Sequence, residues 1–250
     1  MFYILFVPLT AITWILFFEY LPWLFGHQMK RLIIPGRQST KTTKKEYLLS
    51  TLNLLVFTGF GALLDFLKSA DLTIFYFEIE FTWTSLLYLP ASLFLSLFIH
   101  DLFFYLSLSH RLLHLPFMHK YIHVHHHQSH TINAWATFSF HPIEGCIQIS
   151  IVCWLPLVLP IHPAIHGIFT VFMLFMSVYG HSGYELRAKK APIFNAFNTS
   201  FHHAQHHQYG NYNFGIYLNF WDRLFKSNHA TYEDGYKHLR EHINGSKDVE

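Results

Sequence analysis

The stretch HKYIHVHHHQSH, residues 119–130, has histidine at six of its twelve positions. The rest of the chain is apolar: of 250 residues, 52% are hydrophobic and 19% are aromatic, while only 13% are charged. A soluble globular domain carries charge on about a quarter of its residues. The composition therefore predicts a membrane protein in which imidazole is concentrated at one place for a chemical reason.

Other features of the composition exclude simpler classes of protein. The formal net charge of +2 is too small to indicate nucleic-acid binding. Cys146 and Cys153 both lie in an apolar run, so we expect small packing residues rather than a disulfide framework or a CxxC zinc site.

Apolar runs long enough to cross a bilayer as a helix, about 20 residues, recur along the chain. We expect spans at Phe2–Phe25, Tyr47–Leu67 and Ser85–Ser107. Residues 145–180 are apolar for longer than one helix requires and contain three prolines, so they are predicted to form two short helices in a membrane hairpin. The predicted fold class is all-α, a multi-pass integral membrane protein with about three spans and this hairpin.

Lys and Arg residues concentrate in cytoplasmic loops of membrane proteins. All basic residues except Lys68 fall within 30–45, 111–120 and 187–247. With the N-terminus outside, three spans and a hairpin put these three segments on the cytoplasmic side. We therefore expect a protein of the bacterial inner membrane or the endoplasmic reticulum, with its histidine-rich segments on the cytoplasmic face.

The spacing of the histidines predicts metal ligands carried on helices. In HRLLH, His110 and His114 are four residues apart, which on a helix puts both rings on one face. The spacing H-x2-H-H occurs in HVHHH and again in FHHAQHH, at His123, His126, His127, His203, His206 and His207. If a helix runs through HVHHH, His125 points away from the other three.

Neutral imidazole is the commonest metal ligand and suits iron, zinc, copper or nickel. Eight or nine imidazoles exceed what one metal ion can use. Two metal ions that share the set are therefore the simplest interpretation.

The boxes HRLLH, HVHHH, FHPIEG, HSGYE, HHAQHH, NYNFG and WDRLF, in this order, resemble the fatty acid hydroxylase superfamily in its sterol desaturase branch. The similar region runs from about Asp101 to Lys226. Members of this family are integral membrane oxygenases with a histidine-bound dinuclear metal centre. The resemblance implies membrane-anchoring helices in 1–90, a catalytic region in 91–230 and a C-terminal tail in 231–250.

Carried over residue by residue, the resemblance implies nine metal ligands: His110, His114, His123, His126, His127, His181, His203, His206 and His207. His119, His125 and His202 are interpreted as supporting or surface groups. The candidates to hold a ligand imidazole by its second N–H are Asp101, Glu144 and Asn213.

Glu185 and Asn213 are the predicted catalytic residues beyond the ligands. Glu185 lies four residues after His181, so on a continuous helix it would reach the same site. Tyr105 lies five residues before His110, whereas relatives commonly have a tyrosine three before this box. Either the helix bulges there or Tyr105 lacks the role of its counterpart. His100 is expected in or near the bilayer.

The implied activity is hydroxylation or desaturation of a C–H bond of a sterol or other lipid, by two iron ions that use O2. Zinc is an alternative occupant in purified protein. The chain lacks a haem-binding domain or flavin signature, so a separate electron-transfer protein is expected as partner. Two other classes remain open: a histidine-rich membrane metal transporter or binding protein, and a zinc-dependent lipid hydrolase with Glu185 as base. The sequence does not indicate the oligomeric state.

Overall fold

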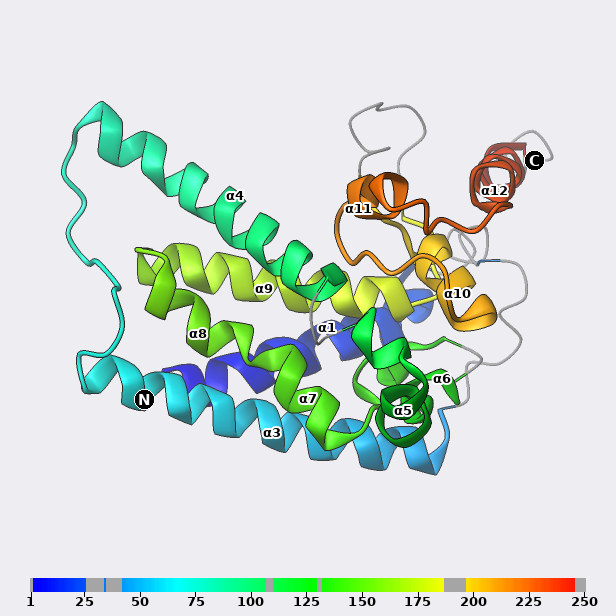
Figure 1. Cartoon of the computed structure of the whole chain (residues 1–250), viewed down its shortest axis with the longest axis horizontal. Coiled ribbons are helices and arrows are strands. Elements are labelled where there is room, and N and C mark those ends of the chain that lie inside the picture. Colours follow the sequence, from blue (N-terminus) through cyan, green and yellow to red (C-terminus); the bar gives the residue numbers. More distant parts are fainter. Residues whose placement is uncertain are drawn as a thin grey trace.

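The computed structural model describes residues 2–25, 34, 42–106, 110–129, 132–186 and 197–245. Within these ranges the regular structure is helical, apart from two isolated β-bridges (Figure 1). The predicted all-α class is therefore confirmed.

Four of the helices are long and apolar enough to cross a membrane. They are α1 (Tyr3–Phe25), α3 (Lys44–Ser69), α4 (Trp83–Leu106) and α9 (Pro163–His181). Helix α1 packs against α3 and α9, and α4 packs against α9 (Figure 1). Large apolar side chains cover the outside of these helices, including Leu5, Leu9, Leu55, Phe66, Leu87 and Phe94. This surface suits lipid rather than water, and the chain is a multi-pass membrane protein.

The hairpin predicted within 145–180 is present, but its second helix is not short. Its first arm is made of α7 (Pro142–Ile149) and α8 (Ile151–Val158), and its second arm is the uninterrupted α9. Pro163 does not break α9 because it occupies the start of the helix, where a missing N–H removes no helical hydrogen bond. The hairpin therefore contributes the fourth membrane-length helix.

Close backbone contact and one carboxylate hold α1 against α3. Gly61 lies directly against the backbone of Tyr3, where any Cβ atom would collide. Asp65 accepts hydrogen bonds from the N–H groups of Phe2 (2.9 Å) and Ile4 (3.0 Å) at the start of α1. These N–H groups at the start of a helix have no partner within the helix, so the carboxylate satisfies them.

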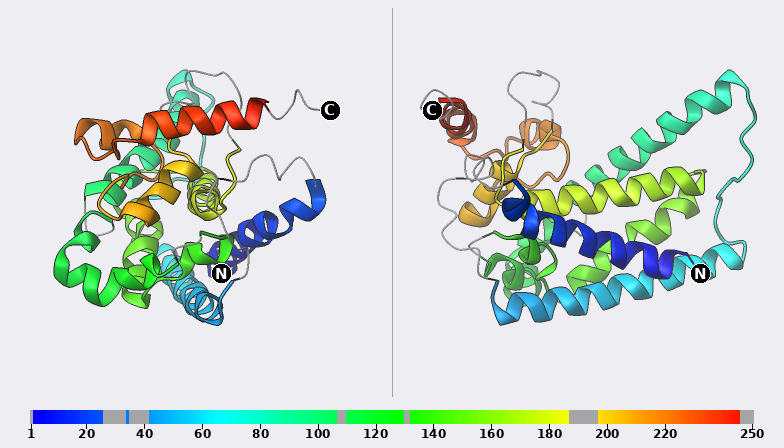
Figure 2. Two further views of the ribbon diagram at one scale, coloured as in Figure 1. Left: turned by 90° about the vertical axis from the view of Figure 1, so that its right-hand side faces the viewer. Right: turned by 180° about the vertical axis from the view of Figure 1, so that it is seen from behind.

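The remaining helices gather at one end of the bundle, where α4 and α9 finish, which we call the histidine end (Figures 1 and 2). Its elements are the 3-10 helices η1 (Leu112–His114) and η3 (Ala134–Phe138), the π-helix η2 (His119–His123), and α5 (Pro116–Met118), α6 (Val124–His127), α10 (Ser200–Tyr209), α11 (Asn219–Leu224) and α12 (Tyr232–Gly245). Most of the predicted C-terminal tail is thus a helix, and its Tyr232, Tyr236 and Leu239 are buried in a cluster with side chains of α10.

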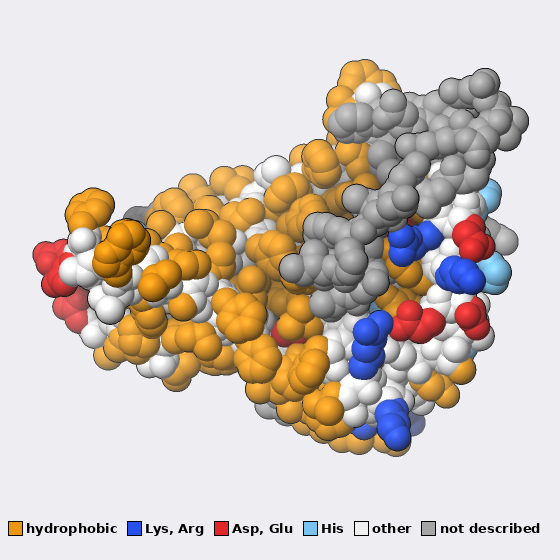
Figure 3. All heavy atoms as spheres, turned by 90° about the horizontal axis from the view of Figure 1, so that it is seen from above, with side chains coloured by type: hydrophobic (Ala, Val, Ile, Leu, Met, Phe, Trp, Pro, Cys, Tyr) orange, Lys and Arg blue, Asp and Glu red, His pale blue; other side chains and the backbone are white. Residues whose placement is uncertain are grey.

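Charge is distributed unevenly between the two ends. Among the described residues, Lys68 is the only basic residue at the end opposite the histidines. That end carries the exposed acidic residues Asp71, Glu78 and Glu80 (Figure 3). The intervening surface is largely apolar, as a protein that lies across a bilayer requires.

Candidate metal centre

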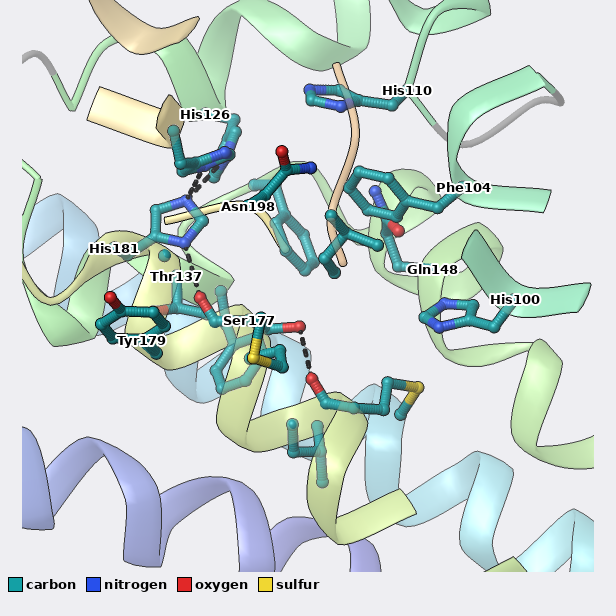
Figure 4. A pocket seen from close by; sticks show the side chains of 18 of the residues that line it. His100, Phe104, His110, His126, Thr137, Gln148, Ser177, Tyr179, His181 and Asn198 are labelled. Carbon is teal, nitrogen blue, oxygen red and sulfur yellow. Dashed lines mark hydrogen bonds between the residues drawn. The ribbon is translucent and has the colours of Figure 1, made fainter. Parts of the chain in front are cut away.

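Histidines from separate parts of the chain form two quartets at the histidine end. The first quartet is His110, His114, His123 and His206, and the second quartet is His126, His181, His203 and His207. Within each quartet, one ring nitrogen per residue lies within 4.8 Å of the others. Figure 4 shows His110, His126 and His181 facing a common cavity. The structure thus brings eight of the nine predicted ligands into two groups.

The HRLLH box does not form the α-helix that its spacing predicted. The backbone turns at His110, continues as the short 3-10 helix η1, and becomes extended at Leu115. Leu115 precedes Pro116, and a residue before proline is disfavoured in the α conformation. His110 and His114 nevertheless enter the same quartet.

The segment FHHAQHH is a regular α-helix that serves both quartets. Thr199 caps α10 by accepting a hydrogen bond from the N–H of His202 (3.1 Å). His203 and His207 belong to the second quartet, whereas His206 belongs to the first. One helix therefore contributes to both groups.

The segment HVHHH also contributes histidines to both quartets, but in the opposite order. His123 ends the π-helix η2 and belongs to the first quartet, whereas His126 on α6 belongs to the second. His127, the ninth predicted ligand, has its Nε2 atom 3.0 Å from Nε2 of His123. It therefore lies beside the first quartet.

The hydrogen bonds of the first quartet fix which nitrogen carries the proton. Nδ1 of His110 donates to the carbonyl of Phe214, and Nδ1 of His206 donates to the carbonyl of Tyr212, both at 2.7 Å. A carbonyl only accepts, so each Nε2 of these neutral rings has a lone pair. The two Nε2 atoms are 2.8 Å apart. Two lone pairs at this distance repel unless a cation lies between them.

The second quartet leads to the same conclusion. Nδ1 of His181 donates to the carbonyl of Ser177 (2.8 Å), which leaves a lone pair on Nε2. The Nε2 atoms of His181, His203 and His207 form a triangle with sides of 2.9, 3.2 and 3.2 Å. Each of these three nitrogens is either a donor or an acceptor, so at least two of them have the same role. Those two cannot be hydrogen-bonded to each other. Nitrogens bound at about 2.0–2.1 Å to one metal ion lie about 2.8–3.4 Å apart, from octahedral to tetrahedral angles, so the spacing fits shared coordination.

Burial keeps these imidazoles neutral. Loss of solvation lowers the pKa of His110 to about 4, and burial together with neighbouring imidazoles holds the pKa of His206 and His207 well below the usual value. Neutral imidazole is the form that binds metal. The donor set therefore fits a pair of transition-metal ions.

One ligand candidate is held by a carboxylate. Nδ1 of His123 lies 2.9 Å from Oε1 of Glu144, and both side chains are buried. A carboxylate that accepts this N–H fixes the orientation of the ring and makes its other nitrogen a better ligand. Glu144 is thus placed as the sequence predicted.

The other two candidates for this role contact different groups, and their assignment is corrected. Asp101 accepts hydrogen bonds from the backbone N–H of Tyr217 (2.8 Å) and from Nε1 of Trp221 (2.9 Å). Asn213 donates to the carbonyl of His202 (3.1 Å) and to Oε1 of Gln205 (3.2 Å). Both side chains hold the segment after α10, which contains the backbone carbonyls that accept hydrogen bonds from His110 and His206. A sequence does not show which backbone carbonyl will take this role.

Glu185 does not follow His181 on a continuous helix. Helix α9 ends at His181, and Gly183 adopts a positive φ of 71° that turns the chain away. Oε1 of Glu185 accepts a hydrogen bond from the hydroxyl of Tyr179 (2.7 Å). Glu185 belongs to neither quartet, so the expected reach along one helix face is wrong.

The three histidines interpreted as supporting or surface groups lie in different surroundings. His119 forms a further group with His114 and His127. His125 points away from both quartets, with Nδ1 3.3 Å from Nζ of Lys45.

His202 is buried, and its Nε2 lies 3.2 Å from Oδ2 of Asp222. Sequence reasoning missed Asp222 as a site residue. This buried carboxylate also accepts the backbone N–H groups of Phe214 (2.9 Å) and Gly215 (2.8 Å). It therefore fixes the segment that presents the Phe214 carbonyl to His110. Its place in the WDRLF box was the available signal.

Tyr105 and His100 both contact the chain that follows α10. The buried Tyr105 hydroxyl lies 2.6 Å from the hydroxyl of Ser227. Nδ1 of His100 lies 2.6 Å from the Tyr217 hydroxyl. Whether the helix bulges before His110 depends on residues 107–109, which lie outside the described residues, as does Ser107, the predicted end of the third span.

A narrow cavity of about 70 Å³ runs from the quartets toward the membrane helices (Figure 4). Histidines of both quartets line one end, among them His110 and His181. The lining continues through apolar side chains such as Phe104, Met173 and Ile216. The cavity therefore places an apolar surface next to the nitrogens that are candidates to bind metal.

Fold and site together define an all-helical membrane protein with two adjoining histidine quartets, suited to metal ions, at the end of an apolar cavity. A family model described as fatty acid hydroxylase matches residues 93–227. The chain belongs to this family, as its boxes implied.

The chain is similar to known sterol-modifying enzymes. It is 36% identical over 117 residues to the Delta(7)-sterol 5(6)-desaturase of Saccharomyces cerevisiae, covering 47% of this chain and 31% of that protein. The enzyme of the same name from Eremothecium gossypii is 30% identical over 188 residues, 71% of this chain and 51% of that protein. Human lathosterol oxidase is 31% identical over 137 residues, 54% and 44% of the two chains. The matches thus span about a third to a half of these relatives. No solved structure matches the chain.

Proposed function

We propose that the protein is a membrane-bound, O2-dependent dinuclear-iron oxidoreductase that hydroxylates or desaturates a C–H bond of a sterol or other lipid. The observation that carries this proposal is the 2.8 Å separation between the Nε2 atoms of His110 and His206, each of which has a lone pair, at one end of an apolar cavity. The names of the sterol desaturase relatives support a sterol as substrate.

Each of the nine predicted histidine ligands is assigned to one of two metal ions. The ligands are His110, His114, His123, His127 and His206 for one ion, and His126, His181, His203 and His207 for the other. Two iron ions held there would supply the activation of O2 and the removal of hydrogen from carbon. Zinc could replace iron in purified protein because imidazole binds both metals.

The protein itself orients the ligands and keeps the site dry. The hydrogen bonds from Nδ1 of His110, His181 and His206 to backbone carbonyls hold each ring with Nε2 toward the site. The apolar lining of the cavity excludes water and positions a substrate carbon beside the ligands.

Substrate and electrons would reach the site from different directions. Residues of α4, α7 and α9 line the cavity, and we propose that these helices separate to admit a lipid from the bilayer. Electrons come from a separate electron-transfer protein that docks at the histidine end. We propose that this end faces the cytoplasm, because the described basic residues other than Lys68 lie there.

The two alternative classes fit the described contacts less well. A transporter would carry ion-binding groups through its spans, but the intramembrane Asp65 and His166 are bonded to backbone groups of the protein. A zinc hydrolase needs a general base at the metal, and Glu185 instead accepts a hydrogen bond from Tyr179.

Metal analysis combined with lipid mass spectrometry tests the proposal. Gently purified protein should hold about two metal ions per chain, as the two quartets imply. Cells that express the chain should accumulate a lipid that has gained one oxygen atom or lost two hydrogens, and cells with His206→Ala should not. An unchanged lipid profile together with metal-free protein would contradict the proposal.

A further inference from the structure

A third group of histidines lies beside the first quartet. His114, His119 and His127 each offer one ring nitrogen, and these atoms lie within 4.8 Å of one another. The ring of His119 is centred 5.5 Å from that of His114 and 5.6 Å from that of His127. The ligand set proposed for the metal centre does not use His119.

His119 lies between the protein surface and the first quartet. His110, His123 and His206 are at most 2% exposed, so an ion in solution has no direct access to them. His114 and His119 are partly exposed. Phe117, Lys120 and Tyr121, which lie within two residues of His119, are exposed. Of the histidines in and beside the first quartet, His114 and His119 are therefore the ones that an incoming ion meets first.

We propose that His114, His119 and His127 form an entry site, through which a divalent transition-metal ion is captured and passed to the first quartet. This inference rests on the metal centre proposed above. Three imidazoles are a complete protein ligand set for a divalent ion that keeps one position open for exchange.

The shared ligands make an inward transfer feasible. His114 belongs to both groups, and Nε2 of His127 lies 3.0 Å from Nε2 of His123. An ion held by the entry site can therefore break its bond to His119 and form one to His123 while the other two imidazoles stay bound. Each step exchanges one neutral nitrogen for another, so the charge of the site does not change.

The rate of zinc uptake tests this proposal. Metal-free protein in detergent is mixed with Zn²⁺ alone, and a colorimetric zinc chelator follows uptake with time and at equilibrium. His119→Ala should slow uptake about tenfold, an effect of the size seen when a group that supports a metal site is lost. The final content should stay at about two ions per chain, because two quartets remain.

Two further variants separate a ligand role from a structural one. His119→Asp keeps a side chain that binds metal and should restore part of the lost rate. His125→Ala, which removes a histidine that points away from both quartets, should take up zinc like the parent.

Equal rates for His119→Ala and the parent would overturn the entry site. Loss of one bound ion at equilibrium would also overturn it, because His119 would then be a permanent ligand. Failure of the underlying metal centre looks different, since the parent protein itself would then take up no zinc.

Discussion

The segments HVHHH and FHHAQHH carry the same spacing of histidines on two different backbones. In both, the first histidine of the H-x2-H-H spacing belongs to one quartet and the histidine three residues later to the other, as His123 and His126 do in HVHHH. In an α-helix, positions i+3 and i+4 point about 100° apart. One helix can therefore carry ligands for two neighbouring metal ions. The spacing H-x2-H-H is thus compatible with two adjacent sites as well as with a single site.

The two segments differ in how their geometry is held. Helix α10 is regular, and His206 is oriented by a backbone carbonyl. The other segment changes from π-helix to α-helix at His123, and this ring is oriented by the Glu144 carboxylate. π-helical turns are often found at functional sites. The ring of His206 is held by the loop that follows its own helix, whereas the ring of His123 is held by a side chain from α7.

The strongest test of the comparison removes the histidine at i+3 from each segment. His206→Ala and His126→Ala should each reduce bound metal from about two ions to about one, because each variant breaks a different quartet. Lipid oxidation should fall by more than about 100-fold, beyond the loss expected for supporting groups. Metal analysis and lipid mass spectrometry provide the measurements. If either variant kept both ions and its activity, the division into quartets would be wrong.

The second test concerns the support that only the irregular segment requires. Glu144→Ala should lower metal affinity or activity about 10 to 100-fold, because Nδ1 of His123 loses its acceptor. Glu144→Gln keeps an acceptor oxygen without the charge, so its loss should be smaller. Metal retention against a chelator measures both variants. Equal and negligible losses would show that His123 is held by something other than Glu144.

The third test uses a property that both segments share, the burial of neutral imidazole. In metal-free protein the pKa of His110 is lowered to about 4, and that of His126 and His206 lies well below the usual value. The unfolded chain therefore binds more protons than the folded one as the pH falls below about 6.5. Stability should be full above that pH and decline by about 1.4 kcal/mol per pH unit for each such histidine as the pH falls toward about 4.

Thermal unfolding of metal-free protein in detergent, at a series of pH values between about 7.5 and about 5, measures this decline. His110→Asn removes one titrating group and should flatten the dependence. A midpoint that does not change with pH would mean that these imidazoles are solvated rather than buried.

The smallest effect is expected at His125, which lies within HVHHH but outside the proposed ligand set. His125→Ala removes a partly exposed ring whose Nδ1 contacts Nζ of Lys45. A surface change of this kind alters stability by no more than about 0.5 kcal/mol, and metal content and activity should match the parent. A lost metal ion would show that the segment is rotated relative to the structure described here.

The expectations that succeeded depend on composition and on local spacing. Apolar runs predicted α1, α3 and α4, because a bilayer forces any spanning backbone to satisfy its own hydrogen bonds. The ordered boxes predicted the family, which the match to residues 93–227 confirmed.

The expectations that failed assumed that a local pattern continues through a turn. HRLLH was expected to be helical, but the proline that follows it favours an extended Leu115. Glu185 was expected on the face of His181, but Gly183 ends the helix before it. Pro163 was expected to interrupt a helix, but it is the first residue of α9.

By itself, the sequence determined that the chain is a helical membrane protein, that it belongs to the fatty acid hydroxylase family, and which histidines were candidates to bind metal. Only the tertiary structure decided which histidine joins which quartet, and which groups orient the rings. His110 and His206 are 96 residues apart, and their Nδ1 atoms are held by the carbonyls of Phe214 and Tyr212. Every residue has a carbonyl, so the sequence cannot show which one a fold will turn toward an imidazole.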